Sequence, residues 1–198
     1  MILLFALLQV FASDEEALYA RVVAIRYGLE CEDKAAGSYL SIVGPLHRGL
    51  VRLHKVALYV PVDDGHLGVS IDRIATCSCS QSECKQTWIV EIKCLYSIRT
   101  YPPGLDMALE KLDFLEVSPS GIRLKESAKY CTQVEMHMGV SKIYKAELWI
   151  SSINERPLAP ITVTYNDLFW AHLKAKLDVF YAKYVCPSIV SYISTYNR

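Results

Sequence analysis

The segment Trp88–Cys94 limits what this chain can fold into more than any other stretch. Its large apolar residues alternate with Ile89, Glu91 and Lys93, and this period of two is that of a β-strand. The alternation places an acid and a base on one face of an otherwise apolar strand. Because burying an unpaired charge is costly, this face requires charged partners, a metal ion or contact with solvent. The alternative is a half-exposed strand with Glu91 and Lys93 on its solvated side.

Two further strands are predicted upstream of this segment. Residues 67–76 form a strand-like run that carries Asp72, and residues 50–60 form the run before it, ended by an Asp-Asp-Gly turn. The polar residues 77–86 are predicted to form a loop. Strands joined by such connections predict an antiparallel meander, with Asp72 and Glu91 on neighbouring strands.

The region before these strands is predicted to be helical. One helix is expected over 14–27, with Ser13 as its N-cap, and a second is expected from Gly28 to Tyr39. In the second helix, small residues share one face with Glu32, so this helix could lie close on a sheet with the carboxylate pointing inward. The alternative is that Glu32 belongs to a solvated, charged helix surface.

The second half of the chain alternates between helices and strands. Its most regular element is an amphipathic helix over 124–139, with Gly139 as its C-terminal stop. A long final helix over 166–185 is predicted to end before Pro187. The remaining predictions are a short helix over 105–114, a turn at 118–121, and strands over 141–151 and 161–164.

The composition fits one packed domain spanning residues 1–198, because 52% of the residues are hydrophobic. The formal net charge of +0 gives no general sign of nucleic-acid binding, which would need a local basic patch. The seven cysteines include Cys77-Ser78-Cys79, which lacks the C-x-x-C spacing typical of zinc sites. We interpret the cysteines as reduced thiols in a reducing compartment, with a structural metal or a disulfide set as the alternatives.

Residues 1–12 are almost wholly apolar and precede the core, which we place at about 14–190. They are interpreted as a secretory signal peptide, a buried first helix or a truncated N-terminus. The segment lacks the basic residue that usually opens a signal peptide, and it is too short to span a bilayer.

Four motifs occur in a fixed order along roughly residues 20–190. They are Gly28-x-x-x-Glu32-x-x-Ala35-x-x-x-Tyr39, Ser70-Ile71-Asp72, Glu91-Ile92-Lys93-Cys94 and Tyr130-x-x-Gln133-Val134-Glu135-x-x-Met138. In this order they resemble the YqaJ-type viral recombinase or alkaline exonuclease group of the PD-(D/E)XK nucleases, which is related to phage lambda exonuclease. The resemblance implies an α/β (α+β) fold, with a restriction-endonuclease-like core and a mixed central β-sheet flanked by helices.

The resemblance also implies phosphodiester hydrolysis by a metal-activated water. Mg²⁺, or Mn²⁺ as a substitute, would bind Asp72, Glu91 and the backbone carbonyl of Ile92, since hard cations prefer oxygen ligands. Glu32 would complete the metal shell directly or through water.

Two further residues are given catalytic roles by the resemblance. Lys93 would orient or deprotonate the attacking water, with a pKa lowered by burial beside the metal. Gln133 would hold a phosphate or the water by hydrogen bonds.

The substrate implied by the resemblance is DNA, mainly double-stranded DNA with ends, in recombination or repair. The predicted DNA contacts are Lys125, Lys129, Tyr130 and Ser70, with the two lysines on one helix. The implied partners are a second copy of the chain and a single-strand annealing protein, with no membrane. The protein would be intracellular, and nuclear in a eukaryote, or secreted if residues 1–12 are a signal peptide.

Three departures from the group's motifs bear on this hypothesis: Ile71 replaces a usual Pro, Arg73 a frequent Gly, and Glu135 a second Gln. One alternative is a catalytically inactive, DNA-binding relic of a viral or transposon-derived YqaJ-type nuclease. Another is an unrelated secreted domain held by disulfides.

Overall fold

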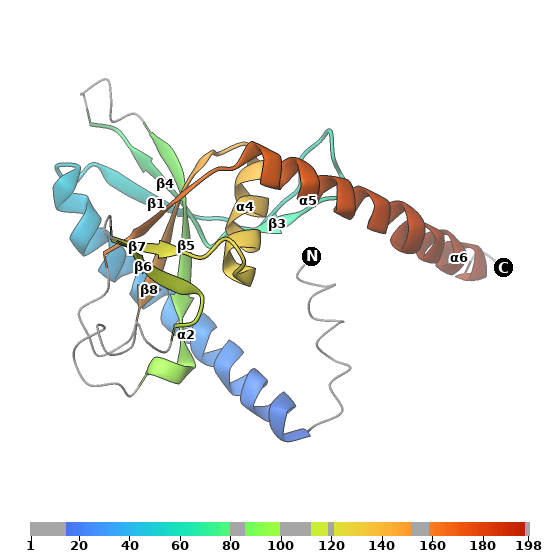
Figure 1. Cartoon of the computed structure of the whole chain (residues 1–198), viewed down its shortest axis with the longest axis horizontal. Coiled ribbons are helices and arrows are strands. Elements are labelled where there is room, and N and C mark those ends of the chain that lie inside the picture. The colour runs from blue at the N-terminus through green and yellow to red at the C-terminus, as the bar shows by residue number, and fades with distance from the viewer. Residues whose placement is uncertain (1–14, 80–85, 100–111, 119–120, 152–158, 197–198) are drawn as a thin grey trace.

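A five-stranded mixed sheet lies at the centre of the molecule (Figure 1). The computed structural model describes residues 15–79, 86–99, 112–118, 121–151 and 159–196. The apolar start at 1–12 lies outside the described residues, as does most of the helix predicted at 105–114. The sheet order is β1-β4-β5-β8-β9, with β1 (Val51–Lys55), β4 (Arg73–Cys77), β5 (Thr87–Cys94), β8 (Lys145–Ser151) and β9 (Ile161–Thr164).

The strand pairing confirms the antiparallel meander and explains the mixed character of the sheet. β1 pairs with β4 and β4 with β5 in antiparallel fashion, whereas β5 pairs with β8 in parallel. A parallel pair needs a crossover connection, and the segment between β5 and β8 supplies it. This segment contains the short 3₁₀ helix η1 (Tyr96–Ile98), a two-stranded hairpin and the helix α4 (Lys129–Ser141).

The two strands predicted before Trp88 are each divided in the structure. The run 50–60 becomes β1 and β2 (Leu58–Tyr59), and the run 67–76 becomes β3 (Val69–Ser70) and β4. β2 and β3 form a separate small sheet, so the chain changes sheets between β3 and β4. Asp72 therefore lies in the break between two strands rather than within one.

A single long helix, α2 (Glu15–Leu46), replaces the two helices predicted at 14–39. Its buried face carries Ala35 and Tyr39, which are 1% and 0% exposed, as the small-residue pattern predicted. A Cβ on Gly28 would lie 3.9 Å from the backbone oxygen of Cys94, which is an ordinary van der Waals distance, so α2 runs beside the end of β5 here.

Helix α4 covers the opposite face of the sheet and begins later than predicted. Leu124 belongs to β7 (Gly121–Leu124), which pairs with β6 (Leu115–Ser118), so the helix cannot start there. The prediction that Gly139 stops the helix is also wrong, because α4 continues to Ser141. A Cβ at position 139 would overlap the ring of Trp170, so this glycine provides space for a neighbouring helix.

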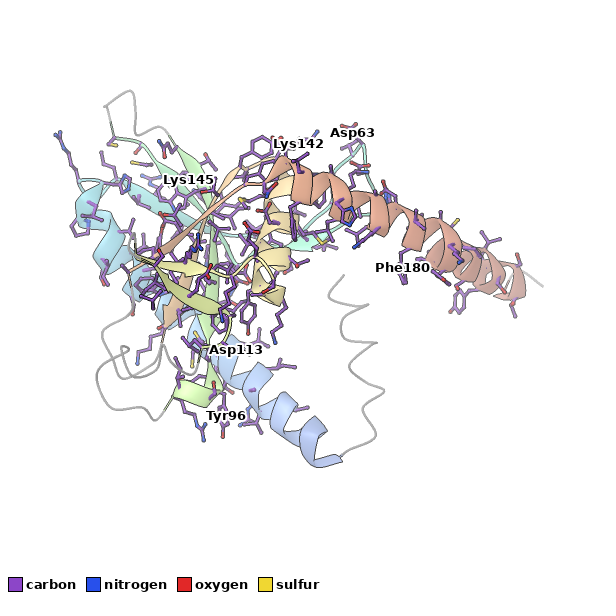
Figure 2. All side chains as sticks on the ribbon, in the orientation of Figure 1. Asp63, Tyr96, Asp113, Lys142, Lys145 and Phe180 are labelled. Atoms are coloured by element: carbon purple, nitrogen blue, oxygen red, sulfur yellow. The ribbon has the colours of Figure 1, made fainter. Side chains whose placement is uncertain are left out.

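The C-terminal helix passes Pro187, contrary to the prediction. α5 (Asp167–Phe180) continues through a π-helical turn, η2 (Tyr181–Val185), into α6 (Cys186–Tyr196). The amide of Cys186 donates to the carbonyl of Tyr181, five residues back. Such a widened turn accommodates a proline that would clash in a regular α-helix. The resulting long helix extends away from the sheet, and Figure 2 labels Phe180 along it.

Two hydrophobic clusters lie on the two faces of the sheet. Trp88, Val90 and Ile92 of β5 pack with the α2 side, whereas Ile89 packs with the α4 side. An exposed ion pair joins Lys142, after the end of α4, to Asp63 at 3.8 Å, and Figure 2 labels both residues. Within the described residues, no helix combines the length and the apolar character needed to cross a membrane.

Candidate active site

Asp72 is held against the middle of β5 by a backbone contact. Its Oδ2 accepts a hydrogen bond from the amide of Ile92, 2.8 Å away. The chain leaves the small β2–β3 sheet at this point, and β4 begins at the next residue, Arg73. The change of sheet thus brings the Asp72 carboxylate to the strand that carries Glu91 and Lys93, as the motif order predicted.

Glu91 belongs to β5, and its side chain is fully buried between this strand and α4. Its Oε1 accepts hydrogen bonds from Lys93 Nζ at 2.5 Å and from Gln133 Nε2 at 2.7 Å. Its Oε2 lies 3.1 Å from Nδ1 of His137, one helical turn beyond Gln133. The two atoms are close but not aligned for a hydrogen bond, so Oε2 is buried without a hydrogen-bond donor among the described residues.

The two carboxylates on this side of the sheet have opposite pKa shifts. Burial raises the pKa of Asp72 to about 7, assisted by the negative charge of nearby Glu91. Burial also acts to raise the pKa of Glu91, but Lys93 and His137 outweigh it and lower that pKa to about 2. At neutral pH, Glu91 is therefore ionised, whereas Asp72 lies near its titration midpoint.

The ammonium of Lys93 has the shift expected from its acidic neighbours. Burial acts to lower the pKa of Lys93, but the charges of Glu91 and Asp72 raise it further, so the net shift is upward. The sequence predicted a lowered pKa for this lysine beside a metal. The structure shows the opposite direction for Lys93 beside the two carboxylates alone.

Glu32 lies on α2, on the other face of the sheet from Glu91. Its Oε1 accepts from Arg73 Nη1 at 2.5 Å, and the same guanidinium pairs with Asp33. Arg73 is buried, so these contacts fasten α2 to the start of β4. Glu32 is near enough to Asp72 to contribute to its raised pKa, but its contacts are with the arginine.

The residues predicted to contact DNA fall into two groups. Lys129 and Tyr130 begin α4 beside Lys93, and Lys93 Nζ is 5.0 Å from the Tyr130 ring centre. Lys125 precedes the helix rather than lying on it, and its Nζ donates to the backbone oxygen of Asp113. Ser70 belongs to β3, two residues before Asp72.

The donor set suits a hard divalent cation. The buried Glu91 Oε2 has no hydrogen-bond donor and could accept a cation instead. The raised pKa of Asp72 means that its negative charge is disfavoured in the protein alone, and a nearby cation would stabilise that charge. The carboxylate oxygens of Glu32, Asp72 and Glu91 do not form a group within 4.8 Å of one another. Asp72 and Glu91 are thus the two carboxylates that could share a cation, whereas the Glu32 carboxylate is paired with Arg73.

Sequence analysis missed two residues of this site. Arg73 was noted only as a departure from the motif, whereas it neutralises Glu32 and Asp33. His137 was placed on the correct helix but given no role. Its spacing of four residues from Gln133 puts both side chains on one helix face, and this spacing could have identified it.

Comparison with known proteins shows a fold shared with solved structures and no match to a protein family. No family model matches the chain, and no curated protein matches it. The chain is similar to the crystal structure of an alkaline exonuclease, LHK-Exo, from Laribacter hongkongensis, with a TM-score of 0.58. It is also similar to the structure of LHK-Exo in complex with dAMP, with a TM-score of 0.60.

Both similarities have 16% sequence identity and cover 88% of this chain and 74% of the other. Identity at this level supports a common fold. The mixed sheet flanked by helices, which the motifs predicted, is therefore a fold that this chain shares with LHK-Exo.

Proposed function

We propose that this protein is a Mg²⁺-dependent deoxyribonuclease that hydrolyses phosphodiester bonds at the ends of double-stranded DNA. The observation that carries the proposal is the convergence of Asp72, Glu91 and Lys93 at one point of an exonuclease-like fold. A structural role alone would not require a buried and a half-buried carboxylate beside a lysine among apolar residues.

Asp72, Glu91 and the carbonyl of Ile92 would hold the cation, and Mn²⁺ could replace it. The bound cation would supply an activated water and stabilise the leaving oxygen. The protein's own part is to keep these ligands in position. The Ile92 amide fixes Asp72, while Gln133 and His137 approach Glu91 from α4.

Lys93 is suited to act on the water and the phosphate. Its side chain is 16% exposed, so the ammonium reaches the edge of the site while it contacts the buried Glu91. A cation on the same carboxylates would offset their negative charge and lower the pKa of Lys93 from its raised value. Lys129 and Tyr130 lie beside it and would contact the DNA backbone.

The test is digestion of linear and closed circular duplex DNA with Mg²⁺, without it, and after chelation. We expect loss of linear DNA only, in the presence of Mg²⁺ or Mn²⁺, by the wild type. Lys93→Ala should spare the DNA, whereas Lys176→Ala, a surface change on α5, should not. End-labelled substrates would give the polarity.

Other outcomes separate the parts of the proposal. Cutting of both forms would support the site and contradict the preference for ends. Binding of DNA without cutting by the folded wild type would contradict the nuclease proposal. That result would favour an inactive, DNA-binding relic of a nuclease. In such a relic, Glu32 and Glu91 would remain only as partners of neighbouring side chains.

A further inference from the structure

A second group of metal-ligating residues lies at the other end of the β4–β5 pair. One ring nitrogen of His47 and the sulfurs of Cys77 and Cys79 all lie within 4.8 Å of one another. Cys77 ends β4, and His47 follows the last residue of α2. The three residues are thus brought together from two elements that are 30 positions apart in the chain.

The backbone around these side chains is fixed by hydrogen bonds. The amide of Ser78 donates to the carbonyl of Leu50 at 3.2 Å. The amide of Cys77 donates to the carbonyl of Gln86 at 3.1 Å. On the helix side, Gly49 has a φ of +73° and its amide donates to the Gly44 carbonyl at 2.7 Å. This turn ends α2 and holds His47 at the end of β4.

The surroundings of the group favour a ligand rather than solvent. Cys77 and Cys79 are 6% and 4% exposed, and the Nδ1 atom of His47 is buried without a hydrogen-bond partner. The His47 ring stacks on Trp88, 5.5 Å between ring centres, which fixes its plane. A buried imidazole nitrogen with no partner is costly, and a metal ion would satisfy it.

The chemistry of the donors selects the metal. Two thiolates and an imidazole are soft or borderline ligands, which suit Zn²⁺ and not the Mg²⁺ of the carboxylate site. The two sulfurs are 3.1 Å apart, and tetrahedral ligands at Zn–S distances of 2.3 Å would be about 3.8 Å apart. The two sulfurs would have to separate by about 0.7 Å to admit the ion.

We propose that His47, Cys77 and Cys79 bind a structural Zn²⁺ ion, with water or another donor in the fourth position. The ion would join the end of α2 to the end of β4. Because α2 carries Glu32 and the β4–β5 pair carries the carboxylate site, this link would hold the elements of the candidate active site in register. The Cys77-Ser78-Cys79 spacing alone did not indicate zinc, because the third ligand comes from a distant helix.

The first test is the metal content of the full chain, purified without chelator, exposed to Zn²⁺ and dialysed. We expect about one Zn²⁺ per chain. The double variant Cys77→Ser/Cys79→Ser should lose it. His47→Phe keeps the aromatic ring over Trp88 but removes the ligand, and it should weaken binding. Cys186→Ser and His54→Ala serve as matched thiol and imidazole controls and should retain the metal.

Co²⁺ substitution supplies a spectroscopic signature of the ligands. Thiolate-to-cobalt charge-transfer bands and intense tetrahedral d–d bands should appear in the wild type and vanish in the double cysteine variant. A zinc chelator should also lower the melting temperature of the wild type and leave that of the double variant unchanged.

Three results would overturn the proposal. The first is a wild type that holds no more Zn²⁺ than the double cysteine variant. The second is Zn²⁺ that is lost in Asp72→Asn and kept in the cysteine variant, which would place it at the carboxylates. The third is a disulfide between Cys77 and Cys79, found by mass spectrometry after alkylation. None of these measurements uses DNA, so they are independent of the proposed nuclease activity.

Discussion

The guanidinium of Arg73 lies 2.5 Å from the carboxylate of Glu32 and ties the long helix α2 to the first residue of β4. Arg73 is 4% exposed, and it also contacts Asp33 and the backbone oxygen of Asp72. The buried guanidinium of Arg73 therefore contacts two carboxylates of α2 and the backbone carbonyl of Asp72, whose side chain is a proposed metal ligand.

Replacing Arg73 with Met should destabilise the protein. The change leaves Glu32 without its partner in a largely buried position, and loss of one partner of a buried pair costs about 3 kcal/mol. Urea unfolding would measure the loss, and Arg52→Met on the neighbouring strand, where the side chain is exposed, is the control. Adding Glu32→Gln to Arg73→Met should restore part of the stability. If the double variant is no more stable than the single one, the pair is not what holds α2.

His137 should act on the proposed reaction through Glu91. Its Nδ1 is 3.1 Å from Glu91 Oε2, and removing such a neighbour of a metal ligand typically lowers activity by about 10- to 100-fold. We expect His137→Leu to reduce kcat on linear duplex DNA with a smaller change in KM, because it orients the ligand and does not bind DNA. His172→Leu, at an exposed position of α5, is the matched control. An unchanged kcat would show that Gln133 and Lys93 suffice to position Glu91.

The part of the fold that the sequence predicted best is the part governed by simple alternation. β5 (Thr87–Cys94) contains the whole of the predicted segment Trp88–Cys94, and β9 begins and ends as predicted at Ile161 and Thr164. In β9 the buried residues alternate with exposed ones, whereas residues 88–92 of β5 are all buried because the sheet is covered on both faces. The same alternation correctly placed Glu91 and Lys93 together.

The parts that the sequence did not predict depend on contacts between distant elements. The change of sheet at Asp72 depends on which strands pair, and a local hydrophobic pattern does not contain that information. From the sequence, Gly139 is typical of a helix C-terminus. Its actual role, to leave room for the ring of Trp170, depends on a contact that the local sequence does not show. Likewise, the π-helical turn that admits Pro187 breaks a local rule that usually holds.

Glu135 provides a test of pH-dependent stability at a position where the motif that this sequence resembles has Gln. Its side chain is buried in α4, and its Oε2 accepts from the amide of Asn166 at 3.2 Å. Burial raises the pKa of Glu135 above its ordinary value, with a smaller contribution in the same direction from Asp167. The protonated form is therefore favoured in the folded state, and its contribution to stability is lost as the pH rises through the folded pKa.

Glu135→Gln should consequently raise the melting temperature at neutral and alkaline pH. The glutamine keeps an acceptor for the Asn166 amide but carries no charge to desolvate. The difference from the wild type should shrink toward zero below the ordinary Glu pKa of about 4.3, where both side chains are neutral. Thermal melts across this range would measure it, with the exposed Asp113→Asn as control. A constant difference at every pH would assign the effect to packing instead of charge.

Gly139 should be intolerant of any side chain because of Trp170. A Cβ at this position would overlap the indole of α5, and forcing extra atoms into a packed contact costs about 1–3 kcal/mol. Gly139→Ala should therefore lower the free energy of unfolding, although alanine is the better helix former. Gly37→Ala is the matched control, because nothing lies within 4 Å of a Cβ there, and that change should stabilise α2 by about 0.5–1 kcal/mol. Combining Gly139→Ala with Trp170→Leu should cost less than the sum of the two single changes, since the smaller side chain removes the overlap. Strictly additive losses would mean that the two helices do not meet at this point.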